Sequence, residues 1–155
     1  MNKTIDAFLS AKEIAIAGTS AKKGNWGTVL MKEISKKGIK AYPINPKYEE
    51  IEGVKCYPSV KDLPESVDSL ILAVNPKLAG EIIDEAADTP IKRVWLNQGV
   101  GDGAWSEENV VKLSEKNMEA VYGFCPMMFF GKGIHKLHYW MRKNLGKTPA
   151  EFSKK

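Results

Sequence analysis

Short apolar segments alternate with amphipathic helical segments along most of the chain, and this alternation constrains the fold more than any other feature. We expect the apolar segments to be strands at residues 13–18, 40–46, 68–76, 91–99 and 118–123. A strand that is apolar on both faces, such as 14–17, needs helices above and below the sheet. Strand–helix–strand units form right-handed crossovers between parallel strands. We therefore predict an α/β fold, Rossmann-like and doubly wound, with a mostly parallel sheet of five or slightly more strands and helices on both faces.

Helices are predicted between the strands from apolar periodicity and from capping residues. The first begins near Trp26 or Gly27 and ends at Gly38, with inward positions at Val29, Leu30, Ile34 and the aliphatic stem of Lys37. The second follows Pro76, with inward positions at Leu78, Ile82, Ile83 and Ala86. The third is expected to start after Ser106, a residue type that is favoured at the N-cap.

The C-terminal segment, residues 131–155, is strongly basic. It holds seven basic residues and one acidic residue, whereas the whole chain has a formal net charge of +4. We predict a basic C-terminal helix at about 131–146, because cations stabilise the carboxyl ends of helices. Arginine occurs only at Arg93 and Arg142, so the arginine-rich pattern of a nucleic-acid surface is missing. We expect no nucleic acid partner, and we leave a homo-oligomer or a protein partner open.

Length and cysteine content limit the number of domains and the cellular compartment that we expect. A chain of 155 residues is typical of one domain, so we predict a single domain over residues 1–155. The two cysteines form no C-x-x-C motif, which favours a reducing compartment. The apolar run 14–18 is shorter than the core of a signal peptide, which has about 7–15 residues. Because no stretch approaches the about 20 apolar residues of a membrane span, we expect a soluble cytoplasmic protein.

Polar residues follow four of the predicted strands, at the point where each strand ends. They are Gly18-Thr19-Ser20, Asn45-Pro46-Lys47, Asn75-Pro76-Lys77 and Asn97-Gln98-Gly99. In open parallel sheets a ligand binds outside the carboxyl ends of the strands, where the strand order reverses. The four segments are therefore predicted to surround one small-molecule ligand.

The loop after the first strand has the composition of a phosphate-binding loop. Glycines allow a tight turn and close approach of the backbone, and the amino end of the following helix attracts an anion. The residues predicted to form this site are Gly18, Thr19, Ser20, Lys22, Gly24, Asn25, Trp26 and Gly27. The spacing G-x5-G-x-x-G differs from the dinucleotide fingerprint G-x-G-x-x-G. It also lacks the Lys and Ser or Thr that a P-loop needs after its second glycine, so we do not expect ATP hydrolysis.

The end of the second strand indicates the kind of nucleotide. A site for NAD places an acidic residue about 20 residues after the glycines, where it binds the ribose hydroxyl. Here Lys47 follows the strand, and the nearest acidic residue is Glu49. Because a lysine suits a ribose that carries an additional phosphate, the residues favour coenzyme A or NADP over NAD.

Five segments together form a recognisable pattern. They read IAIAGTSAKKGNWG, AYPINPKYEEIEGVKCYPSVKDLP, VDSLILAVNP, VWLNQGV and VYGFCPMMFF. In order and spacing they resemble the small CoA-binding domain proteins, which are related to the nucleotide-binding domain of the succinyl-CoA synthetase alpha subunit. The resemblance implies a Rossmann-like fold that holds coenzyme A across the strand ends. The phosphorylated histidine of the synthetase lies in a second domain that we do not find here, so ligase chemistry is not implied.

The resemblance also assigns roles to individual residues. It implies that Gly18, Thr19, Ser20 and the turn to Gly27 bind the pyrophosphate region, and that Lys47 pairs with a phosphate of the coenzyme. The residues implied to flank or contact the rest of the ligand are Val74, Asn75, Pro76, Leu96, Asn97 and Gln98. Phe124 stands before the Cys-Pro pair, where the small relatives usually have arginine, so an anion contact there stays open.

Few residues of the sequence are candidates for chemistry beyond binding. His135 and His138 lie three residues apart without an evident third ligand, so no metal site is predicted. Cys125 follows the fifth strand and is the one candidate thiol, either for a mixed disulfide with coenzyme A or for an acyl group. The alternative is a buried, inert cysteine. Trp26 either lies against the adenine or phosphates or packs in the core, as predicted for Trp95, Trp105 and Trp140.

The function predicted from these residues is binding of coenzyme A or an acyl-CoA by a non-catalytic carrier or sensor. One alternative is a regulator or oxidoreductase-like protein that binds NADP. Another is a protein-interaction module that has lost its ligand. Whether any reaction is catalysed is not decided by the sequence, although its residues favour a binding protein over an enzyme.

Overall fold

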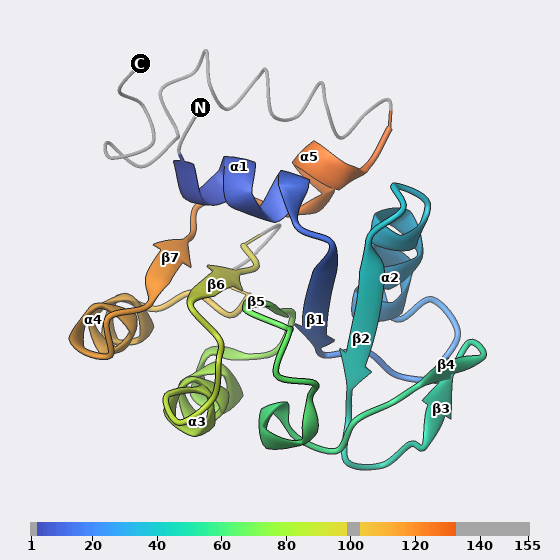
Figure 1. Cartoon of the computed structure of the whole chain (residues 1–155), viewed down its shortest axis with the longest axis horizontal. Helices are drawn as coiled ribbons and strands as arrows, with labels where there is room; N and C mark the ends of the chain where they lie inside the picture. The colour runs from blue at the N-terminus through green and yellow to red at the C-terminus, as the bar shows by residue number, and fades with distance from the viewer. Residues whose placement is uncertain (1–2, 99–102, 133–155) are drawn as a thin grey trace.

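A parallel five-stranded sheet forms the centre of the protein, in the order β2-β1-β5-β6-β7. The computed structural model describes residues 3–98 and 103–132 (Figure 1). The strands of the sheet are β1 (Glu13–Ala17), β2 (Lys40–Ile44), β5 (Ser69–Leu72), β6 (Arg93–Leu96) and β7 (Glu119–Val121). All neighbouring pairs are parallel. The predicted α/β fold with five parallel strands is therefore confirmed.

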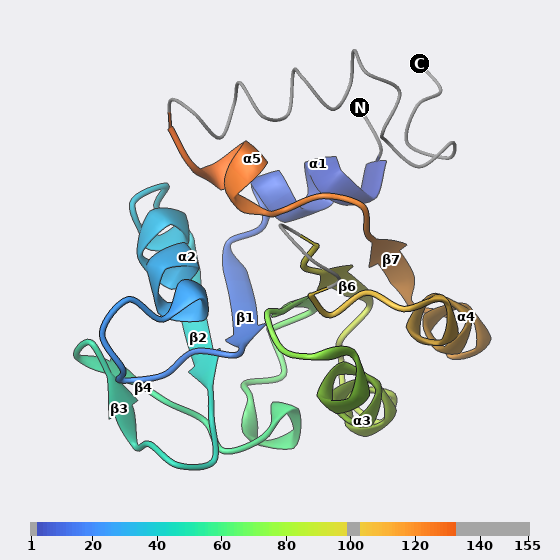
Figure 2. The same ribbon diagram turned by 180° about the vertical axis from the view of Figure 1, so that it is seen from behind.

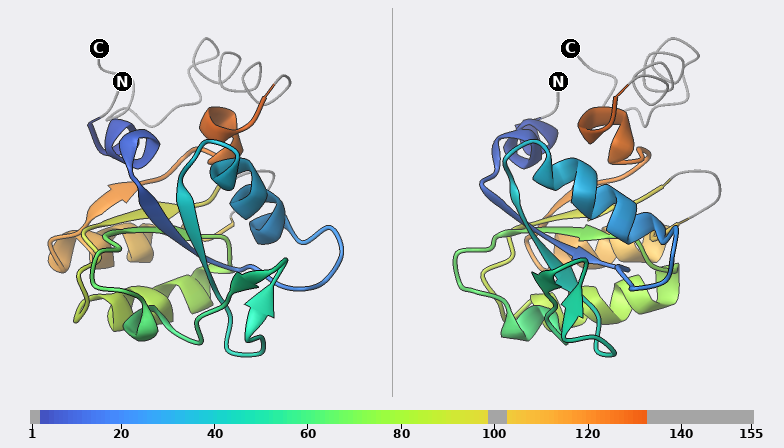
Figure 3. Two further views of the ribbon diagram at one scale, coloured as in Figure 1. Left: turned by 45° about the vertical axis from the view of Figure 1, so that its right-hand side comes forward. Right: turned by 90° about the vertical axis from the view of Figure 1, so that its right-hand side faces the viewer.

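Helices cover both faces of the sheet (Figure 2). One face carries α1 (Lys3–Ser10), α2 (Trp26–Ser35) and α5 (Met127–Phe130), and the other carries α3 (Pro76–Ala86) and α4 (Glu107–Glu115). Figure 3 shows α2 and α3 on opposite sides of the strands. Two hydrophobic cores result: the first core lies between the sheet and α1, α2 and α5, and the second core lies between the sheet and α3 and α4. Within β6, Trp95 belongs to the first core and Leu96 to the second, because successive side chains of a strand point to opposite faces.

The strands end earlier than the apolar pattern suggested. β5 ends at Leu72, and Pro76 is already the first residue of α3. Asn75 ends the connection as the N-cap, since its side chain accepts a hydrogen bond from the N–H of Leu78 at 2.9 Å. Asn75, Pro76 and Lys77 therefore begin α3 directly at the carboxyl edge of the sheet.

Some of the inward positions predicted from periodicity are wrong. Val29 is 38% exposed and Leu78 is 41% exposed, whereas Met31 and Ala79 are buried. Lys37 lies beyond the end of α2 and is exposed. Apolar residues occupy adjacent positions in both helices, so periodicity leaves the buried face ambiguous by about one residue. In α3 the small residues decide the choice, since Ala79 and Gly80 allow close packing.

Four short elements were not predicted. They are α1, α5, the hairpin of β3 (Glu50–Ile51) and β4 (Val54–Lys55), and the 3-10 helix at Val60–Asp62. The hairpin turns at Glu52 and Gly53, both with positive φ. Strands of two residues and helices of one or two turns carry too few positions for a periodic pattern, which explains why they were missed.

The predicted basic helix at about 131–146 falls almost entirely outside the described residues, together with His135, His138 and Trp140. Within residues 3–98 and 103–132, every helix is too short or too polar to cross a membrane.

Candidate ligand-binding site at the carboxyl edge of the sheet

The strand order reverses between β1 and β5, and the site is built around this point. From β1 the chain passes through α2 on one face to β2, whereas from β5 it passes through α3 on the opposite face to β6. The connections therefore diverge after the carboxyl ends of β1 and β5. This is where open parallel sheets leave room for a ligand.

Gly18 directly follows β1 and lies against the neighbouring strand end. Its φ is +100°, and a Cβ at this position would lie 2.1 Å from the carbonyl oxygen of Ala73. An L-residue disfavours this backbone conformation, and a side chain has no space here. Glycine is therefore required at position 18 for two independent reasons.

Gly27, in the first turn of α2, brings the helix onto the end of β1. A Cβ at Gly27 would lie 2.4 Å from the carbonyl oxygen of Gly18. Gly24 has a φ of +74°, but a Cβ there would meet no atom within 4 Å. Close packing of the backbone was expected at Gly24 and Gly27, but only Gly27 packs against another segment, and Gly18, expected to allow the turn, does so as well.

Hydrogen bonds within the loop fix its shape. The Thr28 hydroxyl donates to the carbonyl of Ser20 at 2.7 Å and accepts from the N–H of Ser20 at 3.1 Å. Asn25 caps α2, since its Oδ1 accepts from the N–H of Thr28 at 2.9 Å. The N–H groups of Trp26 and Gly27 lie in the first turn of α2, where the helix itself provides no carbonyl acceptor. They are therefore available to an anion. Thr28 was missed from the sequence, because a threonine at this position does not match the Glu or Gln of a capping box.

The ends of β1 and β2 are joined by side chains that the sequence assigned to the ligand. The Asn45 amide donates to the carbonyl of Thr19 at 2.8 Å, and the buried Thr19 hydroxyl donates to the carbonyl of Ile44 at 3.3 Å. Oδ1 of Asn45 accepts from the N–H of Lys47 at 2.9 Å. Asn45 therefore fixes the backbone that carries the exposed side chain of Lys47.

The ends of β5 and β6 contribute a second group of residues. Asn75 uses Oδ1 to cap α3, and Val74 is half-buried against the second core. Leu96 is fully buried, backbone included, so it packs beneath this edge. Asn97 is 8% exposed, and its Oδ1 has no hydrogen-bond partner among the described residues. A buried acceptor without a partner is costly, which makes Asn97 the most unusual polar residue at this edge.

Lys22 and Lys47 provide exposed positive charge at the carboxyl edge, and Ser20 and Gln98 are half-buried there. Trp26 is also half-buried, and it packs against the first core from the first turn of α2. Part of its ring therefore belongs to the core, and the remainder is accessible.

Both cysteines are buried. Cys125 is 8% exposed and belongs to the first core, which favours the inert alternative over the reactive thiol. Burial raises the pKa of the Cys56 thiol, which donates weakly to the carbonyl of Asn45. No group of three or more His, Cys, Asp or Glu residues suited to a metal occurs within residues 3–98 and 103–132.

The cysteines are expected to resist modification in the folded protein. Incubation with oxidised coenzyme A should give no covalent adduct by intact mass, because a buried thiol rarely becomes an exposed thiolate. The same incubation in urea should give adducts on both residues. An adduct on the folded protein that is lost in Cys125→Ser would instead support the reactive thiol.

Comparison with known proteins identifies the family. Residues 12–130 match the family described as CoA binding domain. An ADP-forming acetate–CoA ligase II from Archaeoglobus fulgidus is 33% identical over 119 residues, which are 72% of this chain and 18% of the ligase. A solved hypothetical protein from Pyrococcus horikoshii is 34% identical with a TM-score of 0.73, covering 82% of this chain and 87% of that one.

Part of a larger enzyme is also similar to this chain. The solved dinucleotide-forming acetyl-coenzyme A synthetase 1 from Ca. Korarchaeum cryptofilum is 28% identical with a TM-score of 0.65, covering 76% of this chain and 27% of that one. The chain therefore spans less than a third of the length of this synthetase and of the Archaeoglobus ligase. Because the family match extends over the sheet and all four strand ends of the site, we conclude that the chain belongs to the CoA binding domain family.

Proposed function

We propose that the chain binds coenzyme A or an acyl-CoA across the carboxyl ends of β1, β2, β5 and β6, as a non-catalytic carrier or sensor. The observation that carries the proposal is the close approach of Gly18 and Gly27 at the switch point of a CoA binding domain. A backbone this close to a helix start suits a pyrophosphate. The family match supports coenzyme A and offers no support for NADP.

The proposed contacts follow from the geometry of the edge. The loop from Gly18 to Gly27 holds the pyrophosphate, with Lys22 adding charge. Lys47 pairs with the 3′-phosphate, because Asn45 fixes its backbone beside Thr19. The remaining contacts to adenosine or pantetheine come from Val74, Asn75, Pro76, Asn97 and Gln98, with the buried Leu96 packed beneath them.

We propose binding alone and no reaction. The matching ligases are several times longer than this chain, and their names describe the whole enzymes. The residues described here supply a phosphate cradle and exposed lysines, which are means of holding a polyanion.

A thermal-shift series tests the proposed ligand. Coenzyme A is expected to raise Tm, dephospho-coenzyme A to raise it less, and NAD to have little effect. At a concentration of 100 Kd, a ligand stabilises by about 2.7 kcal/mol, which corresponds to a shift of roughly 5–11 °C for a chain of this size. A shift with NADP alone would contradict the choice of coenzyme A. No shift with any nucleotide would favour a protein-interaction module.

Replacing Lys47 tests the assignment of the 3′-phosphate. Lys47→Gln is expected to weaken coenzyme A binding about tenfold in calorimetry, because it removes a charge-assisted hydrogen bond. Binding of dephospho-coenzyme A should be unchanged, since that ligand lacks the phosphate. Lys37→Gln is the control, because Lys37 is also exposed but lies beyond the carboxyl end of α2, away from the site. Equal losses for both ligands would place the 3′-phosphate elsewhere.

A further inference from the structure

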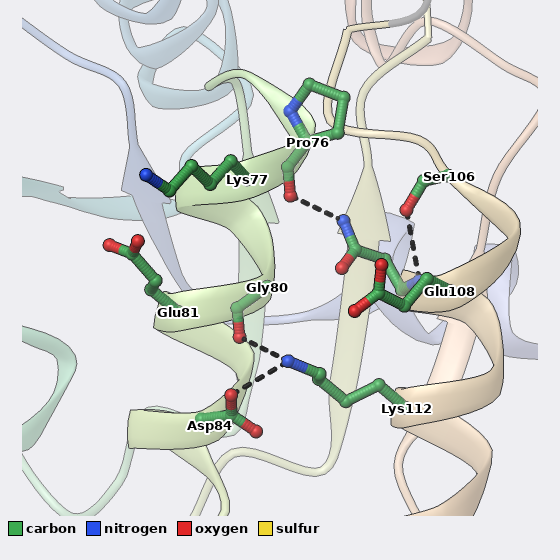
Figure 4. Close-up of a pocket in the computed structure, with 9 residues that line it drawn as sticks. Pro76, Lys77, Gly80, Glu81, Asp84, Ser106, Glu108 and Lys112 are labelled. Atoms are coloured by element: carbon green, nitrogen blue, oxygen red, sulfur yellow. Dashed lines mark hydrogen bonds and ion pairs between the residues drawn. The ribbon is translucent and has the colours of Figure 1, made fainter.

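Asn109 is a buried polar residue on α4, outside the segments assigned to the ligand. It is 2% exposed and lies in the first turn of the helix, where its N–H donates to the N-cap Ser106 at 3.1 Å. It lines the cleft between α3 and α4 that is drawn in Figure 4. Gly80 is on the facing helix, and a Cβ there would lie 2.9 Å from Oδ1 of Asn109. Glycine at position 80 therefore makes room for this amide.

The Asn109 amide joins two loops of the proposed site. Its Nδ2 donates to the carbonyl of Pro76 at 2.8 Å and to the carbonyl of Ala104 at 3.2 Å. Pro76 directly follows Asn75, at the start of α3. The N–H of Ala104 in turn donates to the carbonyl of Asn97 at 2.9 Å. A continuous series of hydrogen bonds thus connects the loop after β5 with the loop after β6.

The amide nitrogen of Asn109 makes the whole bridge, because it has two N–H donors and both are used. The bridge starts from a capped helix end and is buried, so its geometry is firmly held. A coenzyme that contacts both Asn75 and Asn97 requires these loops at one separation. Displacement of one loop relative to the other would break contacts to a ligand without unfolding the sheet.

We propose that Asn109 is a positioning residue that sets the separation of residues 74–76 and 96–98 for one bound coenzyme. The inference rests on the proposed function, and it assigns a role at that site to a residue that does not itself touch the ligand. It also explains why Gly80, on the facing helix α3, has no side chain.

Two substitutions at Asn109 test the bridge. Asn109→Leu keeps a similar volume but removes both donors, and Asn109→Asp replaces them with an acceptor that faces two carbonyls. Each is expected to weaken coenzyme A binding about tenfold in calorimetry, because the carbonyls of Pro76 and Ala104 lose this shared donor and the loops separate.

Lys112→Met is the matched control for packing between the helices. Lys112 joins the same pair of helices about one turn further along α4, donating to the Gly80 carbonyl at 3.3 Å and pairing with Asp84 at 2.8 Å (Figure 4). It is bonded to neither loop of the bridge. Its loss is expected to lower Tm while leaving the affinity for coenzyme A within about twofold. Equal loss of affinity in Lys112→Met and Asn109→Leu would overturn the inference.

Amide spectra of the unliganded protein separate this inference from the proposed function. In ¹⁵N–¹H correlation spectra, Asn109→Leu should move the signals of Asn75, Lys77, Asn97 and Gln98, and Lys112→Met should not. Unmoved signals in a variant that still binds coenzyme A normally would overturn the role of Asn109 alone. A wild-type chain that gives no heat with coenzyme A would overturn the proposed function and the positioning role with it.

Discussion

Gly18→Ala is expected to destabilise the protein by about 3 kcal/mol or more, which corresponds to a fall in Tm of roughly 6–12 °C. Two effects add at this position. The φ of +100° disfavours any side chain, and the new Cβ would lie 2.1 Å from the carbonyl oxygen of Ala73. Relief of that contact requires β1 and β5 to separate at their carboxyl ends. Urea unfolding followed by tryptophan fluorescence measures the loss.

Two further glycines separate the causes of this effect. Gly24→Ala keeps the positive φ but meets open space, so it should cost only about 1 kcal/mol. Gly27→Ala has a helical backbone but places its Cβ 2.4 Å from the Gly18 carbonyl oxygen, so it should cost about 1–3 kcal/mol. If Gly24→Ala and Gly18→Ala lose the same stability, close approach is not what requires glycine at position 18.

Trp95→Ala is expected to cost about 3–5 kcal/mol, a large part of the total stability of a domain. Trp95 is fully buried and makes edge contacts with the rings of Phe8 and Phe129, at centroid distances of 5.3 and 5.4 Å. Its Nε1 donates to the carbonyl of Phe124 at 3.1 Å. The substitution would therefore remove the centre of the first core and a buried hydrogen bond. Thermal unfolding should show a fall in Tm of roughly 6–20 °C.

Trp26→Ala is the contrasting substitution, because Trp26 is half-buried at the start of α2. We expect it to weaken coenzyme A binding more than it lowers stability, with a smaller fall in Tm than Trp95→Ala. Calorimetry with coenzyme A and thermal unfolding of the same samples make the comparison. A loss of stability equal to that of Trp95→Ala, with unchanged affinity, would assign Trp26 to the core.

The fold was predictable because several independent sequence features indicate each of its main strands and helices. The five strands of the sheet lie in apolar runs, and α2, α3 and α4 each begin at a capping residue, so an error at one boundary leaves the topology intact. The buried face of α3 was less predictable, because Leu78 and Ala79 are both apolar and only tertiary packing selects Ala79. Residue type alone does not reveal that packing.

The sequence predicted which residues meet at the carboxyl edge better than it predicted the role of each side chain. The polar residues at the strand ends lie together there, yet Asn45 and Asn75 use their side chains to hold Thr19 and α3. Turn and capping residues have the same composition as ligand contacts, so sequence does not separate them. Asn109 was missed because its partner Pro76 lies 33 residues away in the chain. Contacts of that kind leave no local pattern.

The most direct test of the account is a coenzyme A titration followed by ¹⁵N–¹H amide signals of the wild-type protein. Binding at the carboxyl edge should shift the signals of Gly18, Thr19, Gly27, Lys47 and Asn97. Signals at the opposite edge, including Glu13, Lys40 and Arg93, should stay in place, because they lie at the amino ends of β1, β2 and β6. Shifts confined to that opposite edge, or no shifts at saturating coenzyme A, would contradict the proposed site.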